Sequence, residues 1–242
     1  EKDTGRTPTR FDVQGFNNSQ WSNNFDLSRK FKFSGWPHEI NVAGGASYRY
    51  ESYSIGTGSD DSLYGSGSDA MAGTNAGNAG NFNRDVVAGY VDVSTHLTRH
   101  WQLDLAGRYE HYTDVGDTET GKVSTRYEVS PRLAFRATIS NGFHAPTLAQ
   151  EYYSALAISP TAARGLIGVN SPGALANGAS PLKPERSTNV SGGIVMEPFR
   201  KLHVTVDVYQ INLRDKNDGG APGGKGYNAR GEQIGGRGPG NT

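Results

Sequence analysis

Apolar and polar residues alternate with a period of two along most of this chain. The clearest run is Trp101 to Tyr112, where most odd positions hold apolar or aromatic residues and most even positions hold polar or charged ones. Residues two positions apart lie on the same face of a β-strand. The pattern therefore predicts strands whose two faces meet different environments.

Nine segments carry this alternation, some of them weakly. They are 10–13, 25–33, 40–53, 86–97, 101–112, 122–129, 132–139, about 186–196 and 202–213. Tight turns are expected near residues 35, 99, 131 and 199, and longer loops at 54–83, 113–121, 142–184 and after 214. Strands of ~10 residues with short turns at one end and long loops at the other are typical of outer-membrane barrels. Strands of soluble sandwiches average about 5–6 residues.

The predicted fold is all-β: an antiparallel transmembrane β-barrel, or part of one, with long extracellular loops. One parity is expected to face lipid, and it includes Trp101, Leu103, Leu105, Leu133, Phe135 and Ile139. The other is expected to face a polar lumen, and it includes Asp104, Arg108, Arg126, Arg132 and Arg136. Nine strands alone leave two unpaired edges, so we expect an open, strongly curved sheet or a barrel completed by other chains.

Composition narrows the choice of partners more than the choice of fold. The 242 residues carry a net charge of +0, which removes the usual reason to expect nucleic acid. There is no cysteine, hence neither a disulfide nor a thiolate metal site. No window approaches the roughly 18 apolar residues of a membrane helix, so contact with a lipid bilayer would be made by strands. We expect one domain over residues 1–242, with 217–242 a glycine-rich loop or disordered end.

Candidate chemistry is sparse. The segment Gly219 to Gly226 has the glycine and lysine spacing of a phosphate-binding loop, but Gly226 stands where a Ser or Thr would hold Mg²⁺. No nucleophile, base and orienting group occur at a discriminating spacing, so no catalytic residue and no enzyme activity are predicted. No metal site and no cofactor are predicted either.

Three motifs occur in order along the second half of the chain. They are the run Gly107 to Gln150 with its NGFHAP segment, PLKPERS at 181–187, and VTVDVYQINLRDK at 204–216. Together they resemble the barrel of TonB-dependent outer-membrane receptors, which have a Gly-Phe-Arg-Ala-Pro signature and a Leu-Lys-Pro-Glu segment. The matching residues are Gly142, Phe143, His144, Ala145, Pro146, Leu182, Lys183, Pro184 and Glu185. His144 stands where the family has arginine.

The resemblance implies a receptor in the outer membrane of a Gram-negative bacterium. Such a receptor takes up a scarce nutrient, for example a ferric siderophore or another iron complex, and the TonB complex supplies energy by pulling on a plug. This chain holds no segment resembling a plug, and nine strands are fewer than the ~22 of the family's barrel. We therefore expect a partial barrel domain.

The long loop at 142–184 is the candidate ligand-facing segment. Tyr152, Tyr153 and His144 are the candidate ligand contacts, with packing at the base of the loop as the alternative for the tyrosines. Pro146 and Pro184 restrict the residues before them to extended conformations, which suits strand ends. Two other functions remain open: a stand-alone small outer-membrane barrel acting as porin, adhesin or enzyme, and a soluble β-sandwich binding module.

Overall fold

The computed structural model describes residues 9–63, 72–159, 162–166, 168–171, 174–175, 179–215, 226–227 and 233–234. Within these ranges the chain is almost entirely β-structure. The strands are β1 (Gly15–Phe31), β2 (Ile40–Gly56), β3 (Gly80–Thr98), β4 (Trp101–Tyr112), β5 (Gly116–Ser130), β6 (Leu133–His144), β7 (Ala155–Ser159), β8 (Ala162–Leu166), β9 (Glu185–Phe199), β10 (Leu202–Arg214), β11 (Gly226–Tyr227) and β12 (Gln233–Ile234). The helices whose bounds lie within the same ranges are short, α1 (Asp60–Leu63) and α2 (Leu148–Tyr152).

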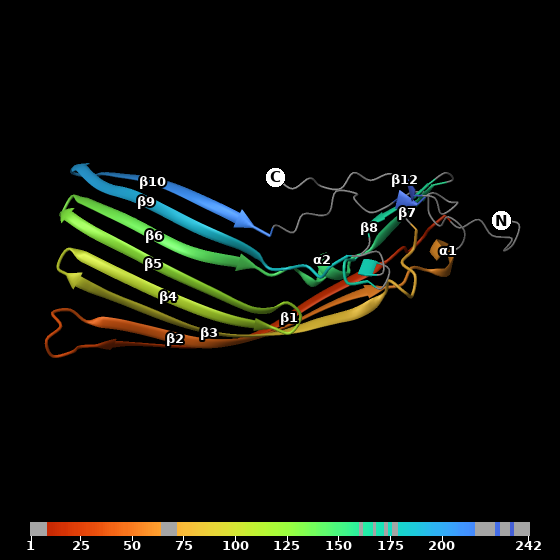
Figure 1. Cartoon of the computed structure of the whole chain (residues 1–242), viewed down its shortest axis with the longest axis horizontal. Coiled ribbons are helices and arrows are strands. Elements are labelled where there is room, and N and C mark those ends of the chain that lie inside the picture. The colour runs from red at the N-terminus through yellow and green to blue at the C-terminus, as the bar shows by residue number, and fades with distance from the viewer. Residues whose placement is uncertain are drawn as a thin grey trace, which may run out of the picture.

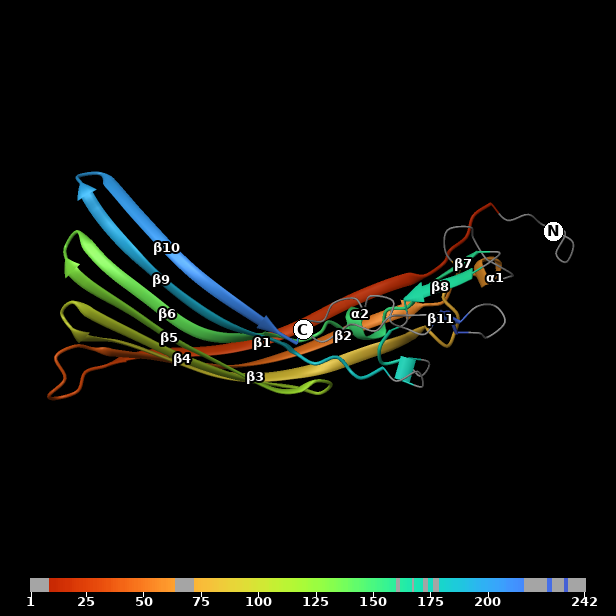
Figure 2. The same ribbon diagram turned by 45° about the horizontal axis from the view of Figure 1, so that its top comes forward.

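Eight strands form one antiparallel sheet in the order β1-β2-β3-β4-β5-β6-β9-β10. The sheet is open and strongly curved, as expected, with β1 and β10 at its two edges (Figures 1 and 2). The short turns lie together at one end, and the two helices, β7 and β8 lie at the other (Figure 1). No helix among the described residues is long and apolar enough to span a bilayer. The only other sheets among the described residues are the two-stranded pairs β7-β8 and β11-β12, so the eight long strands do not form a two-sheet sandwich.

The predicted strand at 10–13 is wrong. The carbonyl oxygens of Asp12 and Val13 accept hydrogen bonds from Ser59 and Thr74 in the loop after β2, so this segment is tied to a loop and not to a neighbouring strand. The first strand is instead β1, which begins at Gly15 and pairs with β2 over its whole length. Its first half is rich in Asn, Ser and Gln, and the sequence pattern missed it because these residues have low strand propensity.

The loop predicted at 113–121 is also wrong, because only residues 113–115 separate β4 from β5. The polar residues that follow continue the ladder, with Asp117 opposite His111 and Gly121 opposite Gly107. Gly116 takes a φ of 80°, which favours glycine at the end of this tight turn. The loops predicted at 54–83 and 142–184 have the shorter bounds 57–79 and 145–184; the first contains α1, and the second contains α2 and the antiparallel pair β7–β8. The prediction for 217–242 lies outside the described residues, apart from the paired strands β11 and β12.

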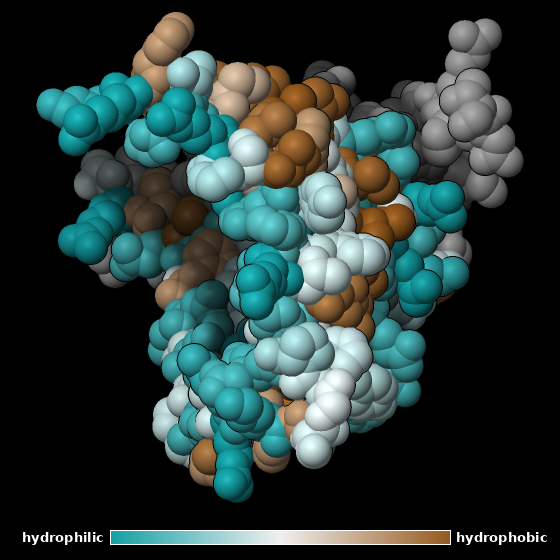
Figure 3. All heavy atoms as spheres, turned by 90° about the vertical axis from the view of Figure 1, so that its left-hand side faces the viewer, coloured by the Kyte–Doolittle hydropathy of each residue, from teal (hydrophilic) through white to brown (hydrophobic). Residues whose placement is uncertain are grey.

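The outward face of the sheet carries an apolar row that crosses six strands in register. Its members are Val42, Val93, Leu105, Val123, Ile139 and Val190. A second row lies four positions closer to the short turns along each strand. It is aromatic and consists of Trp101, Tyr127 and Phe135. Seen from the end with the short turns, hydrophobic side chains gather in patches bordered by hydrophilic ones (Figure 3). An apolar band with an aromatic margin is what a lipid-facing barrel wall requires.

The inward face, against which α2 packs, is held by polar pairs between strands. Lys122 lies 2.8 Å from Asp104, and Arg136 donates to Asp207 at 2.8 Å. These pairs confirm that Asp104, Arg108, Arg126 and Arg136 lie on the opposite face of the sheet from the apolar rows. Arg132, in contrast, lies in a turn. Charges on this face need no contact with lipid, so they can pair across the sheet.

Two polar pairs on the inward face join strands that are not neighbours, and each pair crosses the strand between them at a glycine. Tyr90 on β3 donates to Asp26 on β1 at 2.6 Å, passing over Gly45 of β2, which lies between them. Arg136 on β6 reaches Asp207 on β10 over Gly193 of β9 in the same way. A side chain at either glycine would occupy the space that the bridging groups use.

Replacing Gly45 by alanine should therefore lower the free energy of unfolding by about 1–3 kcal/mol. A Cβ there would lie 2.5 Å from the Phe25 carbonyl oxygen and 2.6 Å from a Tyr90 ring carbon, and the backbone contact has no freedom to move away. Urea unfolding of the receptor in lipid vesicles measures the loss. Gly107→Ala is the matched control, since nothing lies within 4 Å of its Cβ position. Equal stabilities of the two variants would contradict this account.

Candidate functional site

The NGFHAP segment forms the point where β6 leaves the sheet and the long loop begins. Backbone pairing of β6 with β5 ends at Lys122 and Ser140, whereas pairing with β9 continues to His144 opposite Glu185. The side chain of Asn141 fills the resulting gap. It accepts from the Gly121 backbone N–H at 2.6 Å and donates to the Glu119 carbonyl at 2.9 Å. Asn141 thus replaces the ladder hydrogen bonds that β6 no longer makes.

Arg84 on β3 anchors this segment to the inward face of the sheet, which we call the inner wall. Its side chain is only 5% exposed, and its Nη1 donates to the carbonyl oxygen of Pro146 at 2.6 Å. Its Nε and Nη2 contact Glu51 on β2 at 2.7 and 2.6 Å, and its Nη1 also lies 3.2 Å from Asp114 in the β4–β5 turn. One guanidinium therefore joins two strands, a turn and the start of the long loop at Pro146. We call this start, together with α2, the foot of the loop.

The helix α2 packs against β2 and β3 immediately after this contact. Thr147 and Gln150 form a capping box, which satisfies backbone N–H groups at the start of the helix. Leu148 is buried against Tyr53 and Ile55 of β2, and the ring of Tyr152 stacks on Phe82 of β3 with centroids 3.8 Å apart. These contacts place the start of the loop on the inner face of the sheet.

Glu151 of α2 is the most unusual ionisable residue in this region. It is 2% exposed, and its Oε2 has no hydrogen-bond partner among the described residues. Burial and, to a smaller extent, the negative charge of Asp114 raise the pKa of this carboxyl, the positive charge of Arg84 lowers it, and the net result is a pKa of about 7. Glu151 therefore changes its charge near neutral pH.

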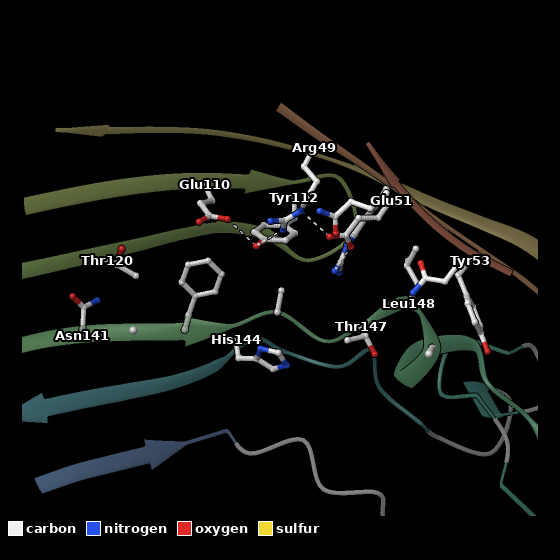
Figure 4. Close-up of a pocket in the computed structure, with 17 residues that line it drawn as sticks. Arg49, Glu51, Tyr53, Glu110, Tyr112, Thr120, Asn141, His144, Thr147 and Leu148 are labelled. Atoms are coloured by element: carbon white, nitrogen blue, oxygen red, sulfur yellow. Dashed lines mark hydrogen bonds and ion pairs between the residues drawn. The ribbon is translucent and has the colours of Figure 1, made fainter. Parts of the chain in front are cut away.

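A hollow of about 680 Å³ lies on the inner face beside α2. Figure 4 shows Arg49 and Tyr112 close together on its wall, with Thr120, Asn141 and His144 on the strands and strand ends beyond them. Arg49 is ion-paired with Glu51 at 2.7 Å and donates to the Tyr112 hydroxyl at 3.2 Å. The Tyr112 hydroxyl in turn donates to Glu110 at 2.8 Å. The charges on the wall are thus held in fixed pairs.

Amides, hydroxyls and aromatic rings also line the hollow. They include Asn18, Gln20, Thr120, Thr147 and Phe143. Such groups can hydrogen-bond and stack with a bulky polar ligand without any covalent step. No cluster of three or more metal-ligating side chains was found within the described residues.

The candidate ligand contacts fall in different places. His144 lines the hollow and is exposed. Tyr152 stacks on Phe82, and Tyr153 lies against Phe16 with ring centroids 5.6 Å apart, so both tyrosines pack at the base of the loop. Of the signature residues, Phe143 packs edge-on against Tyr112, Ala145 is buried, and Glu185 opposes His144. Leu182, Lys183 and Pro184 lead directly into β9.

Sequence reasoning missed Arg84, Asp114 and Glu151. Arg84 lies between the loop predicted at 54–83 and the strand predicted at 86–97, so the pattern assigns it to neither, whereas β3 begins at Gly80. Asp114 lies in the segment 113–121, which the pattern predicts to be a loop. The only local signal was the Thr147 and Gln150 spacing of a capping box, which marks the start of a helix and places Glu151 inside it.

Comparison with known proteins identifies the architecture. The profile of the family described as TonB dependent receptor-like, β-barrel, matches residues 2–233. No match was found among curated proteins.

Solved structures with a similar fold include a variant of the ferric enterobactin receptor PfeA of Pseudomonas aeruginosa in complex with enterobactin. The TM-score is 0.62 at 15% identity, over 82% of this chain and 27% of that one. The siderophore receptor PirA of Acinetobacter baumannii matches with a TM-score of 0.61 at 13% identity, over 83% and 28% of the two chains. PirA of Pseudomonas aeruginosa matches with 0.57 at 17% identity, over 83% and 32%.

This chain thus spans about a third or less of each of those receptors. Identities this low support the fold alone, whereas the family profile covers nearly the whole chain. Members of this family are outer-membrane receptors and not enzymes. The curved open sheet, its apolar outward rows and the profile agree, and the chain belongs to the TonB-dependent receptor-like β-barrel family.

Proposed function

We propose that this chain is part of a receptor that imports a ferric siderophore or a related iron complex across the outer membrane, with energy supplied through TonB. The observation that carries the proposal is the hollow at the loop end of the inner wall. It lies where β1–β6 approach the long loops, and it offers paired charges, amides, hydroxyls and aromatic faces to a bulky polar ligand. The fold shared with siderophore receptors supports the same ligand class.

Transport of iron complexes tests the proposal directly. The full-length receptor would be expressed in a Gram-negative host without its own siderophore receptors, and uptake of ⁵⁵Fe would be followed for a panel of ferric siderophores. We expect uptake of at least one complex, and loss of that uptake when the host's TonB is deleted. Receptor present in the outer membrane without uptake of any complex would contradict the proposal. Uptake that persists without TonB would favour a passive barrel.

His144 is the residue of the signature best placed to touch the ligand. We expect His144→Ala to raise the apparent KM for uptake several-fold while the amount of receptor in the membrane stays the same. His100→Ala is the matched control, because His100 lies in the turn between β3 and β4 at the opposite end of the sheet. Equal effects of the two changes on the apparent KM would contradict a role for His144 in ligand binding.

A further inference from the structure

The foot of the long loop buries a carboxyl group against the inward face of the sheet, and this group has no counter-charge of its own. Glu151 is enclosed between α2 and the wall, and its Oε2 has no partner among the described residues. Arg84, whose positive charge acts on Glu151, is already shared between Glu51, Asp114 and the Pro146 carbonyl. An ionised carboxylate in such a place carries the cost of desolvation without full compensation.

We propose that Glu151 is a proton-binding site that controls the docking of the loop foot, so that protonation holds α2 on the β2–β3 wall and ionisation releases it. The protonated carboxyl is neutral and fits a buried position beside Asp114. The ionised form is repelled by Asp114 and excluded from water. This inference stands whatever ligand the receptor carries.

The neighbouring groups support the same direction of effect. The contacts that keep α2 in place besides Arg84 are the stacking of Tyr152 on Phe82 and the burial of Leu148, and neither changes with pH near neutrality. Glu51 is fully engaged by Arg49 and Arg84, so it is not a free partner for Glu151. The ionisable groups on the elements around α2 include Glu51 and Tyr53 of β2, Arg84 of β3, Asp114 of the β4–β5 turn, and Tyr152 and Tyr153 at the end of the helix.

The sign follows from the pKa of Glu151, which is raised in the docked state to about 7 from an ordinary value of 4.5. Docking is then strongest below the ordinary value, weakens as the pH rises from about 4.5 through about 7, and changes little above that range. A difference of this size corresponds to a change of roughly two orders of magnitude in the docking equilibrium. An acidic medium should thus hold the foot of the loop closed, and a neutral medium should loosen it.

Hydrogen exchange of the intact receptor in detergent micelles tests this mechanism. The reporters are the amides of Glu151 and Tyr153, which donate to Thr147 and Ala149 in the docked helix. Wild type is compared with Glu151→Gln at each pH, so that the intrinsic pH dependence of exchange cancels. We expect rates within a few-fold of each other at pH 5 and, at pH 8, exchange up to about 100-fold faster in wild type than in the variant. A rate ratio that does not change with pH would overturn the proposal.

Two further variants separate a proton site from a general loss of structure. Glu119→Gln removes an exposed carboxylate from β5 near the same end of the sheet, and it should leave the pH dependence as in wild type. Asp114→Asn removes the acidic neighbour, and the midpoint of the exchange transition should move to lower pH. Loss of the transition in Glu119→Gln, or an unchanged midpoint in Asp114→Asn, would refute the assignment.

Discussion

Replacing Arg84 by methionine should lower the free energy of unfolding by about 3–5 kcal/mol, the largest effect we expect from any single change in this chain. The Glu51 and Asp114 side chains, each 17% exposed, would lose their shared counter-ion, and the Pro146 carbonyl would lose its donor. Methionine keeps much of the side-chain volume, so the loss reports on charge and hydrogen bonding rather than on a cavity. Equilibrium urea unfolding of the intact receptor in lipid vesicles measures it.

Arg136→Met is the matched control for this experiment. Arg136 also pairs with a carboxylate, Asp207, but its side chain is 46% exposed and holds one partner instead of three. Solvent screens such a pair, so the loss should be much smaller. Arg84→Lys should recover only part of the stability, because an ammonium group cannot form the fork that reaches Glu51, Asp114 and Pro146 together. Equal losses in Arg84→Met and Arg136→Met would show that Arg84 does not organise the site.

Arginine in place of Leu105 is expected to cost about 2–4 kcal/mol of folding free energy in a bilayer. Leu105 is 42% exposed, and it belongs to the outward row between Val93 and Val123. The aromatic row at Trp101 lies four residues away, about 13 Å along the strand, which puts Leu105 close to the middle of the apolar band. Urea titration of folding into vesicles gives the free energy of each variant.

The adjacent position on the same strand provides the control. Ala106 faces the inner wall and is paired in register with Asp92 on β3, so Ala106→Arg would meet a carboxylate and water instead of lipid. We expect Ala106→Arg to be clearly better tolerated than Leu105→Arg. If the two changes cost the same, the outward face is not the lipid face.

The period-two pattern by itself determined most of each long strand from Val86 onward, namely β3 to β6, β9 and β10, with their two faces and the ends at which short turns and long loops lie. This information is local, because a strand places every second residue on one face whatever its neighbours are. The family motifs added the position where β6 leaves the sheet. The pattern failed where strands are polar, as in the first half of β1 and the start of β5, since backbone pairing with a neighbour holds these segments whatever their side chains are.

Only the tertiary structure decided which distant residues meet at the site. Glu51, Arg84, Asp114 and Pro146 come from four separate segments, and their contacts depend on strand register, which places Glu51 opposite Arg84. The need for glycine at 45 likewise follows from strands on either side of it, not from its own sequence neighbours. The unpaired carboxyl of Glu151 exists because α2 folds back onto that wall. Ion pairing and burial of side chains depend on how the sheet is assembled, so the period-two pattern along the chain cannot predict them.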